Sequence, residues 1–94
     1  MSVAKLKVLA WVAGMQARTS TLLESSLRSQ LEDRIAALPQ GDALRQLVEA
    51  FLSAMDAAAR DPGARIAAGE ALVGGVRHLA LAEAGDNIRR ISGE

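Results

Sequence analysis

The chain lacks cysteine and tyrosine altogether, and Trp11 and Phe51 are its only large aromatic residues. Without cysteine, disulfide bridges, thiolate nucleophiles and cysteine-based metal sites are excluded. The scarcity of aromatic rings also leaves few platforms on which nucleic acid bases can stack. His78 is the only histidine, so a metal site would have to be built almost entirely from carboxylates. We therefore expect neither a metal nor a cofactor.

The sequence motifs of enzymes are missing as well. There is no Gly-x-Ser-x-Gly elbow, and Gly69, Gly74 and Gly75 match no phosphate-binding loop and follow no strand. A catalytic His78 would need a nucleophile or a carboxylate beside it, and the sequence gives no such partner. We predict a structural or surface histidine and a protein that is not an enzyme.

The chain also has no excess of one charge, because eleven basic side chains balance eleven acidic ones. A protein that binds polyanions generally shows a basic excess, which argues against nucleic acid as the partner. The alternative is a small helical DNA-binding regulator that uses either the basic edge formed by Lys5, Lys7 and Arg18 or the basic tail formed by Arg89 and Arg90.

Long hydrophobic runs are absent too. Residues 5–17 place two lysines before an apolar run, which weakly resembles a secretory signal. The run covers only residues 8–15, far fewer than the roughly 20 residues that span a bilayer. We therefore predict no transmembrane span and a cytoplasmic protein. The preference for arginine over lysine, with much alanine and glycine, is typical of a GC-rich bacterial or phage genome.

What the chain does contain is apolar residues at helical spacing. The first stripes predict a helix from Ser2, whose hydroxyl can cap it, to about Arg18. A capping box at Thr21 and Glu24 then predicts a second helix from about Ser20 to Leu38. A single unbroken helix from Ser2 to Leu38 is the alternative.

Proline and glycine mark the later boundaries. Asp42 is the expected N-cap of a third helix that runs to about Arg60. Asp61 and Pro62 begin a fourth helix, which we expect to end at Ala84 with Gly85 as its C-cap. Surface ion pairs are expected on the third helix between residues four apart, namely Arg45 with Glu49 and Asp56 with Arg60.

Within the fourth helix, the small residues Ala67, Ala71 and Gly75 are spaced four apart. They predict a smooth ridge on which another helix can pack closely, and a kink at Gly74 and Gly75 is the alternative. After Gly85, a short amphipathic helical turn carries Ile88 and Ile91, which suggests a tail that docks.

Together these patterns predict one all-α domain over residues 1–94, a bundle of about four helices with a short C-terminal helical turn. Half of the residues are apolar, but alanine is abundant, so the core buries little area per residue. Such a core is often completed by a second copy or by a partner.

We therefore predict a non-catalytic protein-binding module, such as an adaptor, small chaperone, assembly component or inhibitor. Its partner is another protein or a second copy, with a dimer as the expected assembly. The predicted contact residues are Val8, Trp11, Val12, Met15, Ile88 and Ile91. In the opposite interpretation, Trp11 is simply the largest side chain of the monomer's core.

Overall fold

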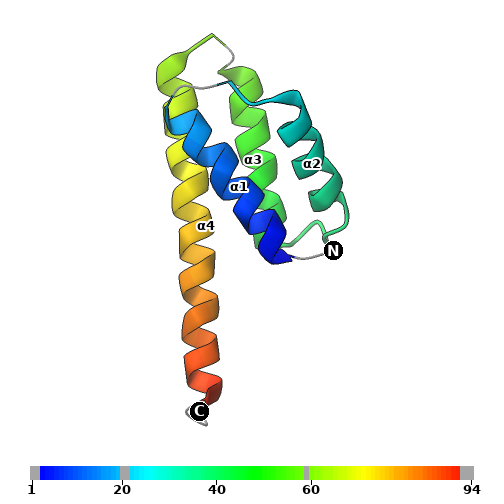
Figure 1. Cartoon of the computed structure of the whole chain (residues 1–94), viewed down its shortest axis with the longest axis vertical. Helices are drawn as coiled ribbons and strands as arrows, with labels where there is room; N and C mark the ends of the chain where they lie inside the picture. Colours follow the sequence, from blue (N-terminus) through cyan, green and yellow to red (C-terminus); the bar gives the residue numbers. More distant parts are fainter. Residues whose placement is uncertain (1–2, 20–21, 59, 92–94) are drawn as a thin grey trace.

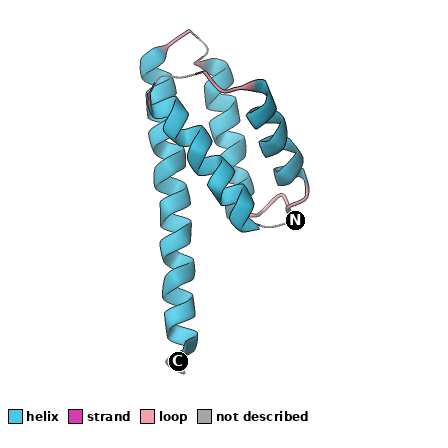
Figure 2. Cartoon of the chain, viewed as in Figure 1, coloured by secondary structure: helices cyan, strands magenta, loops and turns pink. Residues whose placement is uncertain are grey.

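The computed structural model describes residues 3–19, 22–58 and 60–91, and the side chains of residues 4–19, 22–58 and 60–83. Within this part of the chain there are four helices and no strand, which confirms the predicted all-α class (Figure 2). The helices are α1 (Val3–Arg18), α2 (Ser25–Ala36), α3 (Ala43–Ala57) and α4 (Pro62–Ile91).

The four helices form a bundle in which each helix has two main neighbours. α1 packs against α2 and α4, and α3 packs against the same two helices (Figure 1). The most extensive contact is between α1 and α4, where Gly14 and Gly69 allow the two backbones to approach closely. The close packing expected of the glycines is thus present.

The predicted ridge does not lie in the α1–α4 contact; its residues Ala71 and Gly75 lie on the side of α4 that faces Leu47 of α3. A Cβ on Gly75 would meet the side chain of Leu47 on α3, whereas Ala67 and Ala71 are exposed. Gly69 lies instead in the α1–α4 contact. Residues 69 and 71 are about 200° apart around a helix, so they cannot face the same neighbour.

The core contains residues from all four helices. Among the described side chains, the apolar ones most fully buried are Leu6, Ala10, Ala13, Ala17, Leu31, Val48 and Leu72. Four of these seven come from α1 and three of those four are alanines, because α1 lies so close to α4 that larger side chains have no room.

Two predicted helix starts are confirmed. The backbone N–H of Arg45 donates to Asp42 Oδ1 at 3.0 Å, so Asp42 caps α3. Pro62 is the first residue of α4, and the N–H of Ala64 donates to Asp61 Oδ1 at 3.2 Å. In both cases a side-chain oxygen satisfies an amide that has no partner within the helix.

The described residues between 3 and 38 form two helices, but the predicted start of the second is wrong. α2 begins at Ser25, and its N-cap Glu24 is extended and makes no side-chain capping bond. Residues 22–24 are not helical, and Leu23 packs against the core from this segment. Leu23 packs against the core, and the threonine and serine residues that precede it in the sequence have low helix propensity. Together these effects outweigh the capping box as a determinant of where α2 begins. The cap proposed at Ser2 lies outside the described residues.

The predicted end of the fourth helix is also wrong, because α4 continues through Gly85 to Ile91. The C-terminal turn is therefore helical, but it belongs to α4. A glycine costs about 1 kcal/mol relative to alanine and does not by itself stop a helix. At 1.5 Å per residue, the 30 residues of α4 span about 45 Å, and the C-terminal part of α4 extends beyond the other three helices (Figure 1).

An ion pair joins α2 to α3. Arg28 Nη1 and Nη2 donate to Asp56 Oδ1 and Oδ2 at 2.6 and 2.9 Å. Asp56 therefore bonds to Arg28 rather than to the expected Arg60, since α3 ends at Ala57. The predicted pair of Arg45 with Glu49 is confirmed at 2.5 Å.

This pair predicts a specific acid sensitivity. The hydrogen bond from Arg28 lowers the pKa of Asp56 below its ordinary 3.8. A lowered folded-state pKa contributes stability above the ordinary pKa and loses it as the pH falls through the folded value. We expect Asp56→Asn to weaken the fall of the urea midpoint between about pH 5 and pH 2. Asp33→Asn, at an exposed position on α2, is the control, and equal pH slopes for wild type and Asp56→Asn would contradict the prediction.

Candidate functional site

The outer face of α1 is apolar and open to solvent. Val8 is 61% exposed, and Trp11, Val12 and Met15 are 39–40% exposed. These four residues, which we call the α1 stripe, are spaced three or four apart and so share one face of the helix. The inner face of α1 is apolar as well and is buried in the bundle. A surface helix usually carries polar side chains on the outside, so this outer face is unusual.

The α1 stripe is the main cluster of its kind in the described part of the chain. Only two other large apolar side chains are exposed there, Leu22 and Leu81. They lie on different segments, and single exposed apolar residues are normal on protein surfaces. Trp11 is neither sealed in the core nor fully free. Its side chain is 39% exposed, so part of its surface is buried and part faces solvent.

The charged residues that α1 itself contributes beside the α1 stripe are all basic. α1 contains Lys5, Lys7 and Arg18 and no acidic residue. Lys7 forms an ion pair with Glu83 of α4, and Arg18 Nη1 lies 3.5 Å from the sulfur of Met15.

The two groups of basic residues predicted as alternative DNA-binding surfaces lie on different helices, one on α1 and the other on α4. The backbone of Arg18, the last residue of α1, lies beside Gly69 of α4. Residues 89 and 90 lie near the C-terminal end of α4, which extends beyond the other helices (Figure 1). Lys7 is already paired, and the side chains of Arg89 and Arg90 lie outside those described. DNA binding stays an untested prediction.

The predicted tail contacts, Ile88 and Ile91, are also outside the described side chains. Their backbone belongs to α4, beyond the part that packs against the bundle (Figure 1). The docking of this tail therefore stays a prediction.

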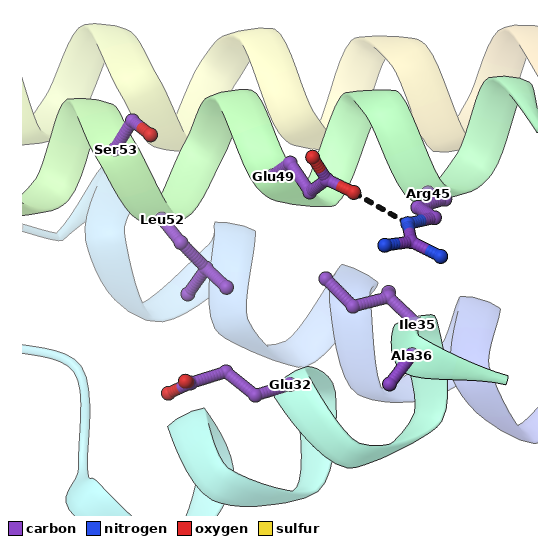
Figure 3. Close-up of a pocket in the computed structure, with 7 residues that line it drawn as sticks. All are labelled: Glu32, Ile35, Ala36, Arg45, Glu49, Leu52 and Ser53. Atoms are coloured by element: carbon purple, nitrogen blue, oxygen red, sulfur yellow. Dashed lines mark hydrogen bonds and ion pairs between the residues drawn. The ribbon is translucent and has the colours of Figure 1, made fainter. Parts of the chain in front are cut away.

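A polar hollow of about 360 Å³ lies between α2 and α3. Its lining residues are Glu32, Ile35, Ala36, Arg45, Glu49, Leu52 and Ser53 (Figure 3). The volume is within the range of small-molecule pockets. Its charged groups already bond to one another or to nearby groups. Arg45 donates to Glu49 and to the Leu38 carbonyl, both at 2.5 Å, and Arg28 donates to Glu32 at 3.0 Å. This arrangement stabilises the helices and offers no evident reactive group.

A second hollow, of about 210 Å³, lies between α3 and α4 and is lined by apolar residues alone. We call it the α3–α4 groove, and its residues are Leu47, Ala50, Phe51, Ala54, Ala68, Ala71 and Leu72. The sequence placed Ala71 in a predicted ridge of small residues, but the groove itself was not predicted. The available signal was the alternation of large and small residues on α3, where Ala50 and Ala54 leave space beside Leu47 and Phe51.

The described residues offer little for catalysis or metal binding. His78 is exposed on α4 and lines neither hollow. Among the side chains that the structure describes, no three histidine or carboxylate groups are placed to hold a metal ion. Over the same residues, no helix combines the length and hydrophobicity needed to cross a bilayer.

Comparison with protein-family models, with curated proteins and with solved structures gives no match, so the function must be argued from the residues of this chain.

Proposed function

We propose that this protein is a non-catalytic protein-binding module whose contact surface is the α1 stripe. The observation that carries the proposal is the exposure of Val8, Trp11, Val12 and Met15 on one face of one helix. A face of this kind is unfavourable in water, and burying it gains roughly 25 cal/mol per Å² of apolar area. A protein partner would supply that burial.

Trp11 is the expected anchor of the contact. Tryptophan is among the residue types most enriched at energetically dominant interface positions. Its side chain is partly buried already, which leaves less side-chain entropy to be lost on binding. The basic residues Lys5 and Arg18 lie at the margin, where charges in an interface stay hydrated and set orientation more than affinity.

The remaining parts of the proposal rest on composition. Arginine, alanine and glycine usage favours a bacterial or phage protein, and the absence of cysteine suits a reducing cytoplasm. No specific observation favours the DNA-binding alternative, and Lys7 of its basic edge is already paired with Glu83.

The proposal predicts protein contacts at α1 that are absent elsewhere on the surface. A photo-crosslinking amino acid at Val8 should give discrete covalent protein adducts in the native cell, to be identified by mass spectrometry. The same probe at Gln30, an exposed position on α2, is the matched control and should give none. Adding Trp11→Ala to the Val8 probe should lower the adduct yield by about tenfold or more, as for an interface anchor.

One further control makes this test decisive. Far-UV circular dichroism should show that Trp11→Ala keeps its helicity, because a loss of helix would also remove adducts. Equal adduct patterns at Val8 and Gln30, or a yield that Trp11→Ala leaves unchanged, would contradict the proposed function.

A further inference from the structure

Met15 places an oxidisable sulfur within the α1 stripe. The chain has no cysteine, so methionines are its only sulfur-containing residues. The side chain of Met15 is 39% exposed, whereas Met55 on α3 is buried in the core and only 6% exposed. A thioether has to meet a peroxide in solution, so exposure decides which of the two sulfurs reacts first.

We propose that Met15 is a site of reversible oxidation and that its sulfoxide releases the protein partner of the α1 stripe. The oxidant is a peroxide, and hydrogen peroxide is the simplest one. The sulfur gives an electron pair to one peroxide oxygen, the O–O bond breaks, and the second oxygen leaves with both protons as water. The inference rests on the proposed function, because it adds a form of regulation to the same α1 stripe.

Arg18 gives the oxidised side chain a partner in the unbound protein. Its Nη1 lies 3.5 Å from the sulfur of Met15, one helical turn away on α1. A thioether sulfur is only a weak hydrogen-bond acceptor. The oxygen of a sulfoxide is a much stronger acceptor, and bonds from a charged donor are stronger than neutral ones. A hydrogen bond from Arg18 to the sulfoxide therefore favours the unbound state.

The sulfoxide is also unsuited to an apolar contact. Met15 shares one face of α1 with Trp11 and Val12, which precede it by four and three residues. Oxidation turns a flexible apolar side chain into a polar one, which must leave water when a partner covers it. Burying such a group without its full set of hydrogen bonds weakens binding by about fivefold or more.

The fold itself does not depend on the oxidised group. The buried face of α1 is made by other residues, which are Leu6, Ala10, Ala13 and Ala17. Oxidation of Met15 should therefore change the surface of α1 and leave the core of the bundle intact.

Peptide mapping locates the oxidation. Trypsin cleaves after Lys7 and Arg18, so the peptide 8–18 contains Met15, whereas the peptide 46–60 contains Met55. During treatment of the purified chain with hydrogen peroxide, we expect the first peptide to gain one oxygen about ten times faster than the second or more. In concentrated urea the two rates should become alike. Equal rates in the folded protein would overturn the inference.

Photo-crosslinking measures the release of the partner. The chain with the crosslinking amino acid at Val8 is oxidised, freed of peroxide with catalase and then mixed with an extract of the native cell, so that the partner is not oxidised. The yield of the adducts seen with the reduced chain should fall by about fivefold or more. Methionine sulfoxide reductase, supplied with a thiol as reductant, should restore the yield.

Substitutions at the methionines assign the effect to one residue. Met15→Leu nearly conserves volume and removes the sulfur, so its adducts should be equally abundant before and after peroxide. Met15→Gln carries a polar side chain of similar length and should lower the adduct yield without any oxidant. Met55→Leu, in the core, is the matched control and should leave the effect of peroxide unchanged.

The possible failures of this inference and of the proposed function are distinct. Adducts that persist when Met15 is fully oxidised would overturn the inference alone, and the α1 stripe would remain a contact surface. A reduced chain without Val8 adducts would contradict the proposed function and remove the partner that oxidation is meant to release. Loss of adducts after peroxide treatment of Met15→Leu would place the sensitive group elsewhere, and loss of helicity on oxidation would mean unfolding; either result overturns the inference.

Discussion

Replacing Gly69 by alanine should destabilise the fold, although alanine is the better helix former. A Cβ at residue 69 would lie 2.5 Å from the carbonyl oxygen of Gly14, 2.6 Å from the amide nitrogen of Arg18 and 2.8 Å from the Cβ of Ala17. Two of these neighbours are backbone atoms, so α1 can relieve the clash only by moving as a whole. Overpacking costs about 1–3 kcal/mol and occasionally more. After the gain of about 1 kcal/mol in helix propensity, the net loss reaches about 2 kcal/mol at the upper end of this range, which is expected here because two backbone atoms are in the way.

Gly74 is the matched control on the same helix. A Cβ there would meet no atom within 4 Å, so Gly74→Ala should stabilise the protein by up to about 1 kcal/mol. Urea unfolding followed by far-UV circular dichroism measures both variants. Equal changes at the two glycines would mean that α1 and α4 are not in the close contact described, and a stabilised Gly69→Ala would overturn it.

Alanine substitutions on the two faces of α1 should have very different effects on the free energy of unfolding. Leu6 is 1% exposed, whereas Val8, two residues later, is 61% exposed. Leu6→Ala leaves a cavity in the core and should lower the free energy of unfolding by about 2–5 kcal/mol. Val8→Ala removes methyl groups that are largely hydrated already, and we expect a change within about 0.5 kcal/mol.

The same urea titrations, made at low protein concentration to avoid association, provide the comparison. A cost for Val8→Ala close to that for Leu6→Ala would place the α1 stripe in the core. A small cost for both would mean that α1 is loosely attached to the bundle. The stability of Val8→Ala also matters for the binding experiments, because it shows that the α1 stripe can be altered without unfolding the chain.

Local signals predicted the boundaries that local chemistry controls. Asp42 and Asp61 supply oxygens to amides at the starts of α3 and α4, and these contacts involve residues only three positions apart. The start of α2 and the end of α4 were predicted less well. The first is displaced by Leu23, which packs against the core from outside any helix, and the second depends on whether Gly85 can be accommodated in a long alanine-rich helix.

The sequence predicted which residues form the α1 stripe but not that this face is the exposed one. The spacing of Val8, Trp11, Val12 and Met15 identified one face of the first helix, but the opposite face is apolar too. Nothing in the first helix itself shows which of two apolar faces is buried. The α3–α4 groove was harder still to predict, because it is a space between residues such as Ala50 and Ala71 that lie on different helices.

By itself, the sequence determined the class of fold, the caps of α3 and α4, and the absence of cysteine chemistry, since these depend on composition and on neighbours within one helical turn. The tertiary structure decided which apolar face is exposed. Gly14 and Gly69 let α1 lie directly on α4, which buries the alanine face of α1 and turns Trp11 and its neighbours outward. That choice follows from how closely two helix backbones can approach, a property of the pair that neither helix carries alone.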